Sequence, residues 1–164
     1  MRFADPEVRE FLAHSMIMRM ASVSPKGQPI LRCLWFVCQR GRIYTFTAQI
    51  TPTGRSISVN PDVNLLFDAE LAPRSPRLLR LRGRAGYRRE RGIVARALLG
   101  IARKYFLTPP GLRNLLAHAR TAPLAVRFYA EPGWEVRGQG VGLITEVVPE
   151  SVEFIPRSPG QAAL

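Results

Sequence analysis

A short predicted helix in the first half of the chain combines residue types that bind phosphate. Thr53, Gly54 and Arg55 stand at its start. We expect the helix to run from Gly54 to Asn60, with Pro61 closing it. Backbone amides at a helix N-terminus bind anions directly, and arginine offers a planar donor fork that matches phosphate. The sequence therefore indicates anion binding at this helix.

The sequence lacks the motifs typical of metal sites, hydrolases and nucleoside triphosphatases. His14 and His118 fall on predicted helices with no second histidine or carboxylate at metal-ligand spacing, so we expect no metal site. No serine, histidine and carboxylate stand in a known motif context, and neither a Gly-x-Gly-x-x-Gly sequence nor a phosphate loop is present. Hydrolase and nucleoside-triphosphatase functions are therefore disfavoured.

The net charge of the chain is +12, from 24 basic and 12 acidic residues. Lys26 and Lys104 are the only lysines, so arginine dominates. A basic field concentrates anionic partners, but arginine that replaced lysine through codon bias would give the same composition, and both interpretations stay open. The arginines are scattered over predicted strands and helices rather than gathered on one element of a recognised nucleic-acid-binding motif, which argues against a nucleic-acid partner.

Antiparallel strands are predicted for the first half of the chain. A helix from Pro6 to His14 precedes them, since Pro6 suits a first helical position. The following residues alternate in a way typical of strands, and tight turns separate them. Because parallel neighbours need long crossovers, strands joined by tight turns favour an antiparallel meander. The predicted strands are residues 16–21, Pro29 to Cys38 and Ile43 to Thr47, with turns at Pro25 to Gln28 and Gln39 to Arg42.

Strands also dominate the second half, around a helical segment at 91–119. There Val94, Leu98, Ile101 and Tyr105 recur at helical spacing, and we expect two helices separated near Pro109 that pack on the sheet. The predicted strands are Val63 to Phe67, Arg77 to Ala85, Leu124 to Tyr129, Val141 to Val148 and Ser151 to Ile155, followed by a loose tail over 156–164.

We expect one domain over 1–164, with an N-terminal helix at 1–14, because the length and the mean hydropathy of -0.03 are those of one globular unit. The longest apolar run, Cys33 to Cys38, is too short to cross a bilayer, and the N-terminus has no apolar stretch. A cytoplasmic location is therefore predicted. Cys33 and Cys38 are expected on one strand, as free and buried thiols.

The order of several short motifs resembles the pyridoxamine 5′-phosphate oxidase-like family of split barrels. The similarity covers Phe11 to Tyr87, with a weaker match at Val148 to Phe154. The motifs are Met20-Ala21-Ser22-Val23, Lys26-Gly27-Gln28-Pro29, Leu34-Trp35-Phe36-Val37, Tyr44-Thr45-Phe46-Thr47, Asn60-Pro61-Asp62-Val63 and Arg82-Gly83-Arg84-Ala85.

This resemblance implies a mainly β fold, an antiparallel split β-barrel with flanking helices, that works as a homodimer and holds FMN at the dimer interface. Arg32 matches the family's arginine that approaches the FMN phosphate and ribityl chain, a role that suits its bidentate fork. Phe46 and Thr47 fall where members contact the flavin, and Thr51 falls near the phosphate. The implied activity is an FMN-dependent oxidoreductase acting on an unidentified small molecule. Trp35 is expected in the core.

The sequence departs from the family pattern at the phosphate clamp. Pro52 and Thr53 replace the usual basic pair, and Arg55 comes two residues late. Thr53 and Arg55 remain candidate cofactor ligands because they begin the helix. Two alternatives follow: a deazaflavin-dependent reductase of the same fold, since a basic groove suits that cofactor's acidic tail, and a non-catalytic barrel that carries or senses flavin or haem.

Overall fold

The computed structural model describes residues 1–47, 51–72, 75–109 and 144–157. In chain order its elements are α1 (Pro6–Ala13), β1 (Met18–Val23), β2 (Pro29–Leu34), β3 (Phe36–Gln39), β4 (Arg42–Thr45), α2 (Pro52–Val59), β5 (Asp62–Phe67), β6 (Arg77–Arg88), α3 (Arg91–Phe106) and β7 (Ile144–Pro156).

Local sequence explains where several elements begin and turn. Helix α1 begins at Pro6, with Glu7 in its first turn, as predicted. The β1–β2 turn contains Gly27 at φ +78°, a left-handed conformation that glycine adopts without steric cost. In the β3–β4 turn both Arg40 (φ 50°) and Gly41 (φ 74°) have positive φ, which is the geometry of a tight two-residue hairpin.

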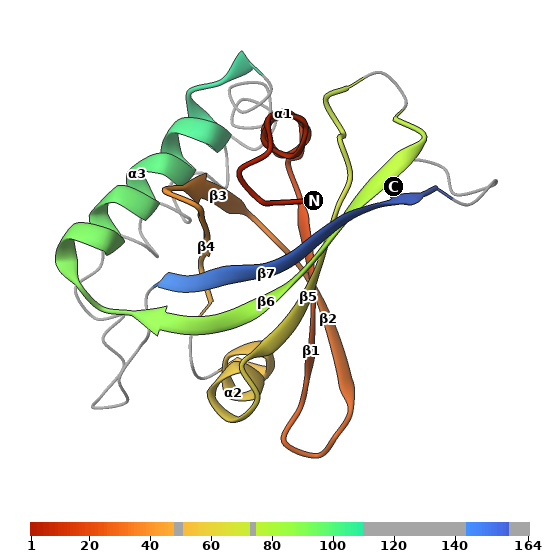
Figure 1. Ribbon diagram of the computed structural model, residues 1–164. Helices are drawn as coiled ribbons and strands as arrows, with labels where there is room; N and C mark the ends of the chain where they lie inside the picture. The colour runs from red at the N-terminus through yellow and green to blue at the C-terminus, as the bar shows by residue number, and fades with distance from the viewer. Residues whose placement is uncertain (48–50, 73–74, 110–143, 158–164) are drawn as a thin grey trace, which may run out of the picture.

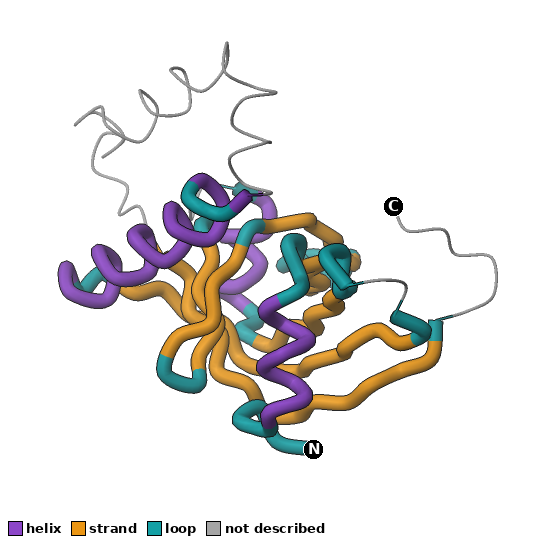
Figure 2. The backbone as a smooth tube through the Cα atoms, turned by 90° about the horizontal axis from the view of Figure 1, so that it is seen from above, coloured by secondary structure: helices purple, strands orange, loops and turns teal. Residues whose placement is uncertain are grey.

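The seven strands form one antiparallel sheet in the order β2-β1-β5-β6-β7-β4-β3. The sheet is strongly twisted and curls into a half-barrel, with α1 and α3 on one side and α2 near the opposite end (Figure 1). In the view from above, α1 lies between strands on either side of it, whereas α3 runs along their outside (Figure 2). This is the split-barrel architecture expected from the sequence.

The strand predicted from Pro29 to Cys38 is wrong as one unit, because it breaks at Trp35 into β2 and β3. Strand β2 pairs with β1, whereas β3 pairs with β4, so the two pieces form opposite edges of the sheet. Cys33 and Cys38 therefore lie on different strands. Both thiols are free and exposed, which corrects the expectation of buried thiols.

The two strands predicted at the C-terminus are one strand, β7, which also includes Pro156. It pairs with β6 on one side and with β4 on the other. Where the sequence predicted a gap between two strands, the single strand has a bulge. Arg82 pairs with Ser151 and Gly83 with Pro149, which leaves Glu150 as the extra residue. The predicted second helix up to Ala119, the strand Leu124 to Tyr129 and most of the tail lie outside the described residues.

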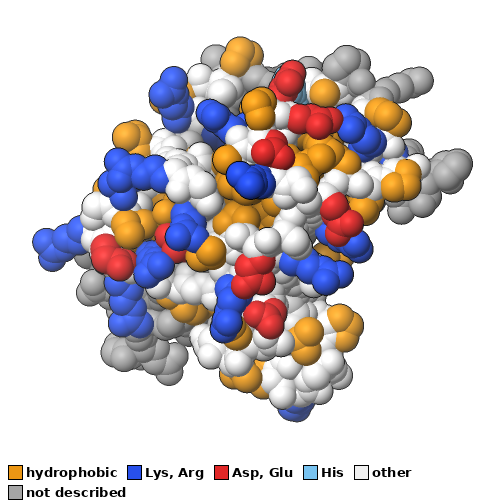
Figure 3. Space-filling model, viewed as in Figure 1, with side chains coloured by type: hydrophobic (Ala, Val, Ile, Leu, Met, Phe, Trp, Pro, Cys, Tyr) orange, Lys and Arg blue, Asp and Glu red, His pale blue; other side chains and the backbone are white. Residues whose placement is uncertain are grey.

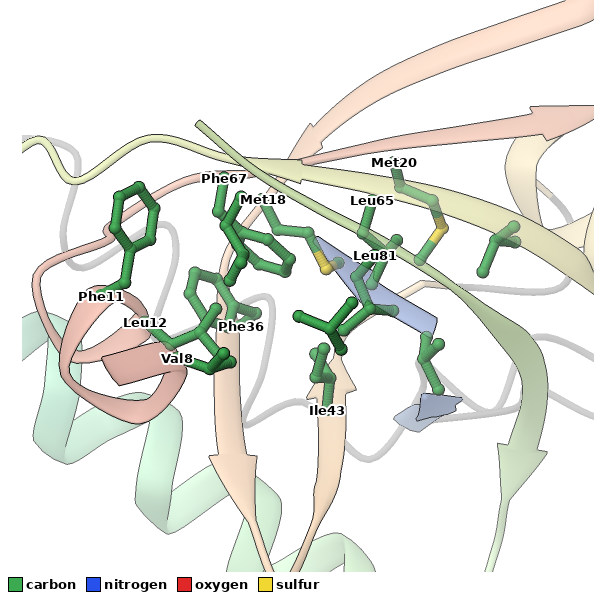
Figure 4. Packing of buried hydrophobic residues seen from close by; sticks show 14 of the residues in the cluster. Val8, Phe11, Leu12, Met18, Met20, Phe36, Ile43, Leu65, Phe67 and Leu81 are labelled. Atoms are coloured by element: carbon green, nitrogen blue, oxygen red, sulfur yellow. The ribbon is translucent and has the colours of Figure 1, made fainter. Parts of the chain in front are cut away.

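One main hydrophobic core fills the concave side of the sheet. Val8 and Leu12 of α1 pack there against strand residues, including Phe36 of β3 and Phe67 of β5 (Figure 4). The rings of Phe36 and Phe67 meet edge to face, with centroids 4.9 Å apart. Alternation along β6 buries Leu79 and Leu81 in this core, as the sequence predicted.

Helix α3 covers the other side of β3 and β4. Ala97 and the partly buried Val94 pack against Tyr44 and Ile144 in a smaller cluster. The Gln39 side chain donates a hydrogen bond to the Arg96 carbonyl (3.0 Å). None of the described helices is long and apolar enough to cross a membrane.

Candidate functional site

Three buried hydroxyl groups have no hydrogen-bond partner within the described part of the chain. They belong to Ser22 on β1, Thr47 after β4 and Thr145 on β7, which are 3%, 5% and 0% exposed. An unsatisfied buried hydroxyl costs about 1–3 kcal/mol, so such groups call for a partner. Each of these hydroxyls could accept a partner that the described residues do not supply.

Helix α2 begins at Pro52, five residues after Thr47 and two residues before the predicted start at Gly54. The Thr51 hydroxyl caps the helix by accepting a hydrogen bond from the Gly54 amide (3.0 Å). Thr53 is buried. The helix contacts β1, β2 and β6, and the Tyr87 hydroxyl of β6 donates to the Gly54 carbonyl (2.9 Å). The helix N-terminus is therefore held against the sheet.

Arg32 lies on edge strand β2, on the same side of the sheet as the core. Its cross-strand neighbour is Met20, which is fully buried, and cross-strand neighbours share a face. The side chain of Arg32 is exposed and forms no ion pair within the described residues. A cationic fork is thus available at this edge.

Phe46 is directed to a different part of the molecule from its neighbour Thr47. It packs against the cluster of Tyr44, Ala97 and Ile144 under α3. It also lines a cavity of about 560 Å³, together with Cys33, Leu34, Trp35, Leu98, Ile101, Ala102 and Phe106. The six residues expected at the site are therefore not brought to one point: Phe46 faces this cavity, while Thr47 is buried and Arg55 is exposed in the first turn of α2.

The cavity is adjacent to the strand break, which Tyr105 of α3 holds in place. The Tyr105 hydroxyl accepts a hydrogen bond from the Phe36 amide (2.9 Å) and donates to the Met16 carbonyl (2.7 Å). The Trp35 ring stacks on the Tyr105 ring, with centroids 4.7 Å apart and an interplanar angle of 11°. The Thr45 hydroxyl donates to the Trp35 carbonyl (2.6 Å). These contacts fix the wall of the cavity.

A buried carboxylate lies on the α3 side of the sheet. Glu146 of β7 accepts hydrogen bonds from the Tyr44 hydroxyl (2.9 Å) and from two guanidinium nitrogens of Arg88 (2.7 and 3.1 Å). Burial alone would raise the pKa of Glu146, but the bonds from Arg88 and Tyr44 outweigh it and hold the pKa below its usual value. Burial and the Glu146 contact raise the pKa of Tyr44. The carboxylate is therefore charged at neutral pH and orients two strands.

Several residues of this region were not identified from the sequence. Helical spacing placed Leu98, Ile101 and Tyr105 on one side of a helix, but spacing does not reveal that two of them line a cavity and the third bonds to a strand break. The unpartnered hydroxyls of Ser22 and Thr145 give no signal in the sequence either, because a serine or threonine in a strand is most often exposed.

Basic side chains do not form one stripe on the face in view. Figure 3 shows Lys and Arg side chains interspersed with acidic and hydrophobic ones. Several arginines of the described residues are paired with carboxylates, including Arg77 with Glu7 and Arg80 with Glu153. This face lacks the continuous basic track of a nucleic-acid-binding surface.

Comparison with known proteins identifies the same fold. A crystal structure of a putative pyridoxamine 5′-phosphate oxidase from Listeria innocua is 16% identical, with a TM-score of 0.56 over 91% of this chain and 95% of the other. The heme storage protein HutZ from Vibrio cholerae is 17% identical, with a TM-score of 0.59 over 95% of each chain. An F420 reductase is 19% identical, with a TM-score of 0.57 over 88% of this chain and 94% of the other.

These structural neighbours share the architecture and differ in function, and among curated proteins none matches the sequence. A family model described as pyridoxamine 5′-phosphate oxidase matches residues 4–124, which is most of the chain. With the seven-stranded half-barrel and its element order, this match assigns the protein: the chain belongs to the pyridoxamine 5′-phosphate oxidase family.

Proposed function

We propose that the chain binds FMN and acts as a flavin-dependent oxidoreductase on a small molecule. The observation that carries the proposal is the hydroxyl of Thr47, which is buried and lacks a partner among the described residues. A polar substituent of a bound ligand would supply that partner. On this observation the residues present fit a flavin cofactor.

Each proposed ligand has a distinct task. Arg32 would pair with the phosphate, because its guanidinium is exposed on the core side of an edge strand. Thr47 would donate or accept a hydrogen bond, and Thr51, Thr53 and Arg55 would present the polar start of α2 to the anion. Phe46 would contact the flavin through its main chain, because its side chain packs under α3. Bound FMN would supply the hydride-accepting and hydride-donating chemistry.

A homodimer with the cofactor at its interface belongs to the same proposal. Exposed leucines flank the cavity: Leu98, which lines it, is 38% exposed, and Leu99 and Leu107 on or next to α3 are 70% and 77% exposed. Leu31 on edge strand β2 is 64% exposed. A second copy of the chain would cover this apolar surface, and light scattering of flavin-bound protein measures the assembly directly.

Arg32→Ala should weaken FMN binding by about 1.5–3 kcal/mol, the usual range for hydrogen bonds to charged groups. Riboflavin has the same ring without the phosphate, so its affinity should not change. Titration of each flavin, followed by the quenching of its fluorescence, measures both affinities.

The matched control is Arg82→Ala, which removes an exposed strand arginine from the outer face of β6. FMN affinity should be unaffected by this control. Equal losses for FMN and riboflavin in Arg32→Ala, or no loss at all, would contradict phosphate binding by Arg32.

Thr47→Val should raise the stability of the flavin-free protein by about 1 kcal/mol, since it replaces an unsatisfied buried hydroxyl with a methyl group of similar size. The same change should lower FMN affinity, because the hydroxyl that bonds the cofactor is lost. Urea unfolding and FMN titration give the two numbers. Thr45→Val is the control: its hydroxyl already donates to Trp35, so this variant should lose stability. A loss of stability in Thr47→Val would show that Thr47 has a protein partner.

A second candidate is a related barrel that binds a deazaflavin or haem instead of FMN. The sequence feature that favours it is the substitution of the basic clamp by Pro52 and Thr53, with Arg55 exposed one turn into α2. The visible spectrum of the freshly purified protein separates these candidates. A flavin band supports the leading proposal, a Soret band supports the haem carrier, and a colourless protein that binds no added FMN contradicts the flavin proposal.

A further inference from the structure

A second cavity, of about 500 Å³, lies between α1, the β3–β4 turn and α3. The elements that line it, α1, the β3–β4 turn and α3, lie on the side of the half-barrel away from α2 (Figure 1). Its walls are apolar in part and cationic in part. The described lining residues are Phe3, Ala4, Arg9, Leu12, Ala13, Val37, Cys38, Gln39, Arg40, Gly41 and Lys104.

Lys104 is the cation that the fold holds most closely in this cavity. It projects from α3 past edge strand β3, and its Nζ lies 3.5 Å from the centre of the Phe36 ring. Burial lowers the pKa of Lys104 to about 8, while Cys38 and Glu70 oppose that shift. The amine is therefore largely protonated at neutral pH, in a place where its charge is poorly solvated.

No acidic side chain among the described residues neutralises this charge by direct contact. Glu70, the carboxylate whose charge acts on Lys104, accepts a hydrogen bond from the Met16 amide (2.7 Å) and faces Arg19 at 3.6 Å. Arg9 and Arg40 add two further cations to the rim, and none of the described lining residues is an acid. The cavity thus combines excess positive charge with apolar walls.

We propose that this cavity is a binding site for a small organic anion with an apolar body, such as a medium-chain carboxylate. The carboxylate would pair with the Lys104 ammonium, and the apolar body would lie against Leu12 and Val37. An ion pair at a partly desolvated ammonium is stronger than one at the surface, and the apolar contact adds to it. This site is independent of the one proposed for FMN.

Octanoate is the probe, and the two lysines make the test internally controlled. Octanoate should slow acetylation of Lys104 by acetic anhydride about tenfold, because the paired ammonium loses less of its proton, and it should leave exposed Lys26 unchanged. Mass spectrometry of the two lysine peptides reads both rates. The uncharged analogue 1-octanol should not protect Lys104. Equal acetylation rates of Lys104 with and without octanoate would overturn the proposal.

Substitutions of Lys104 test whether octanoate binding depends on the positive charge of the side chain or only on its size. Lys104→Met keeps the length of the side chain and should weaken octanoate binding, measured by calorimetry, about tenfold or more, whereas Lys104→Arg should retain it within a few-fold. Lys26→Met is the matched control and should bind like the wild type. FMN affinity should be the same in all of these proteins, so failure of either proposal is seen separately. Unchanged octanoate affinity in Lys104→Met, or no binding by the wild type, would overturn the assignment.

Discussion

Tyr105→Phe should lower the free energy of unfolding by about 3 kcal/mol, because one lost hydroxyl leaves two main-chain groups without a partner. The Phe36 amide and the Met16 carbonyl both bond to this hydroxyl, and Tyr105 is 2% exposed, so water cannot replace it. Each buried unsatisfied group costs about 1–3 kcal/mol. The aromatic ring and its stacking on Trp35 remain, which isolates the effect of the hydroxyl.

Urea unfolding followed by circular dichroism measures this loss. Tyr87→Phe is the matched control, since it also removes a tyrosine hydroxyl that bonds to the main chain. The Gly54 carbonyl that Tyr87 contacts keeps a second donor, the Ser58 hydroxyl (3.0 Å). This control should therefore lose about 1 kcal/mol or less. Equal losses in the two variants would mean that the strand break does not depend on Tyr105.

Gly83→Ala should destabilise the protein by about 3 kcal/mol, at the upper end of the usual cost of overpacking. A Cβ atom at Gly83 would lie 2.3 Å from the Val148 carbonyl oxygen and 3.1 Å from the Val147 side chain. The first contact is with main chain, which cannot rotate away. The bulge between β6 and β7 is located here, so relief of the clash would require the two longest strands to separate locally.

Gly86→Ala on the same strand is the control for the effect of replacing a glycine with alanine where no clash occurs. No atom lies within 4 Å of the Cβ position at Gly86, and alanine should be tolerated or slightly stabilising there because it restricts the unfolded chain. Thermal unfolding of both variants gives the comparison. A melting temperature of Gly83→Ala close to that of Gly86→Ala would show that the strands accommodate a methyl group at the bulge.

The fold class was predictable because turns and alternation are local properties of the sequence. Gly27 and Gly41 marked two hairpins that the structure contains, and the alternation of Leu79 and Leu81 with arginine identified the buried face of β6. The order of these signals also resembled the family that the later comparison identified. Local patterns therefore sufficed for element types and for the antiparallel pairing of neighbours.

The break at Trp35 was not predictable, because the residues on both sides of it have equally strong strand character. At the break, the Phe36 amide that begins β3 donates to the hydroxyl of Tyr105, which is 69 positions away and which no local pattern connects with it. The merging of the two C-terminal strands into β7 has a similar origin. The predicted gap between Val148 and Ser151 contains Pro149, which pairs with Gly83 beside the bulge and so stays within one strand.

The candidate cofactor-binding residues could be predicted only from their positions in the motifs that resemble the family. The structure puts Arg32 on the core side of β2 and gives Thr47 an unpartnered hydroxyl, whereas it turns Phe46 toward α3. Adjacent residues in an extended segment point in opposite directions, so one motif supplied residues to two separate regions. Cofactor binding by Arg32, Thr51, Thr53 and Arg55 stays a prediction that the flavin titrations test.

The position of β7 in the sheet has a consequence for how the molecule assembles. The C-terminal strand lies between β6 and β4, so Ile43 pairs with Val147, a residue more than a hundred positions later in the chain. The β1–β2 and β3–β4 hairpins can form early and independently, but among the described strands only β7 pairs with strands of both halves of the sheet, so this pairing waits until β7 has been synthesised and inserted. We therefore expect late, slow closure during biosynthesis, with the inner sides of β4 and β6 open to wrong pairing until then.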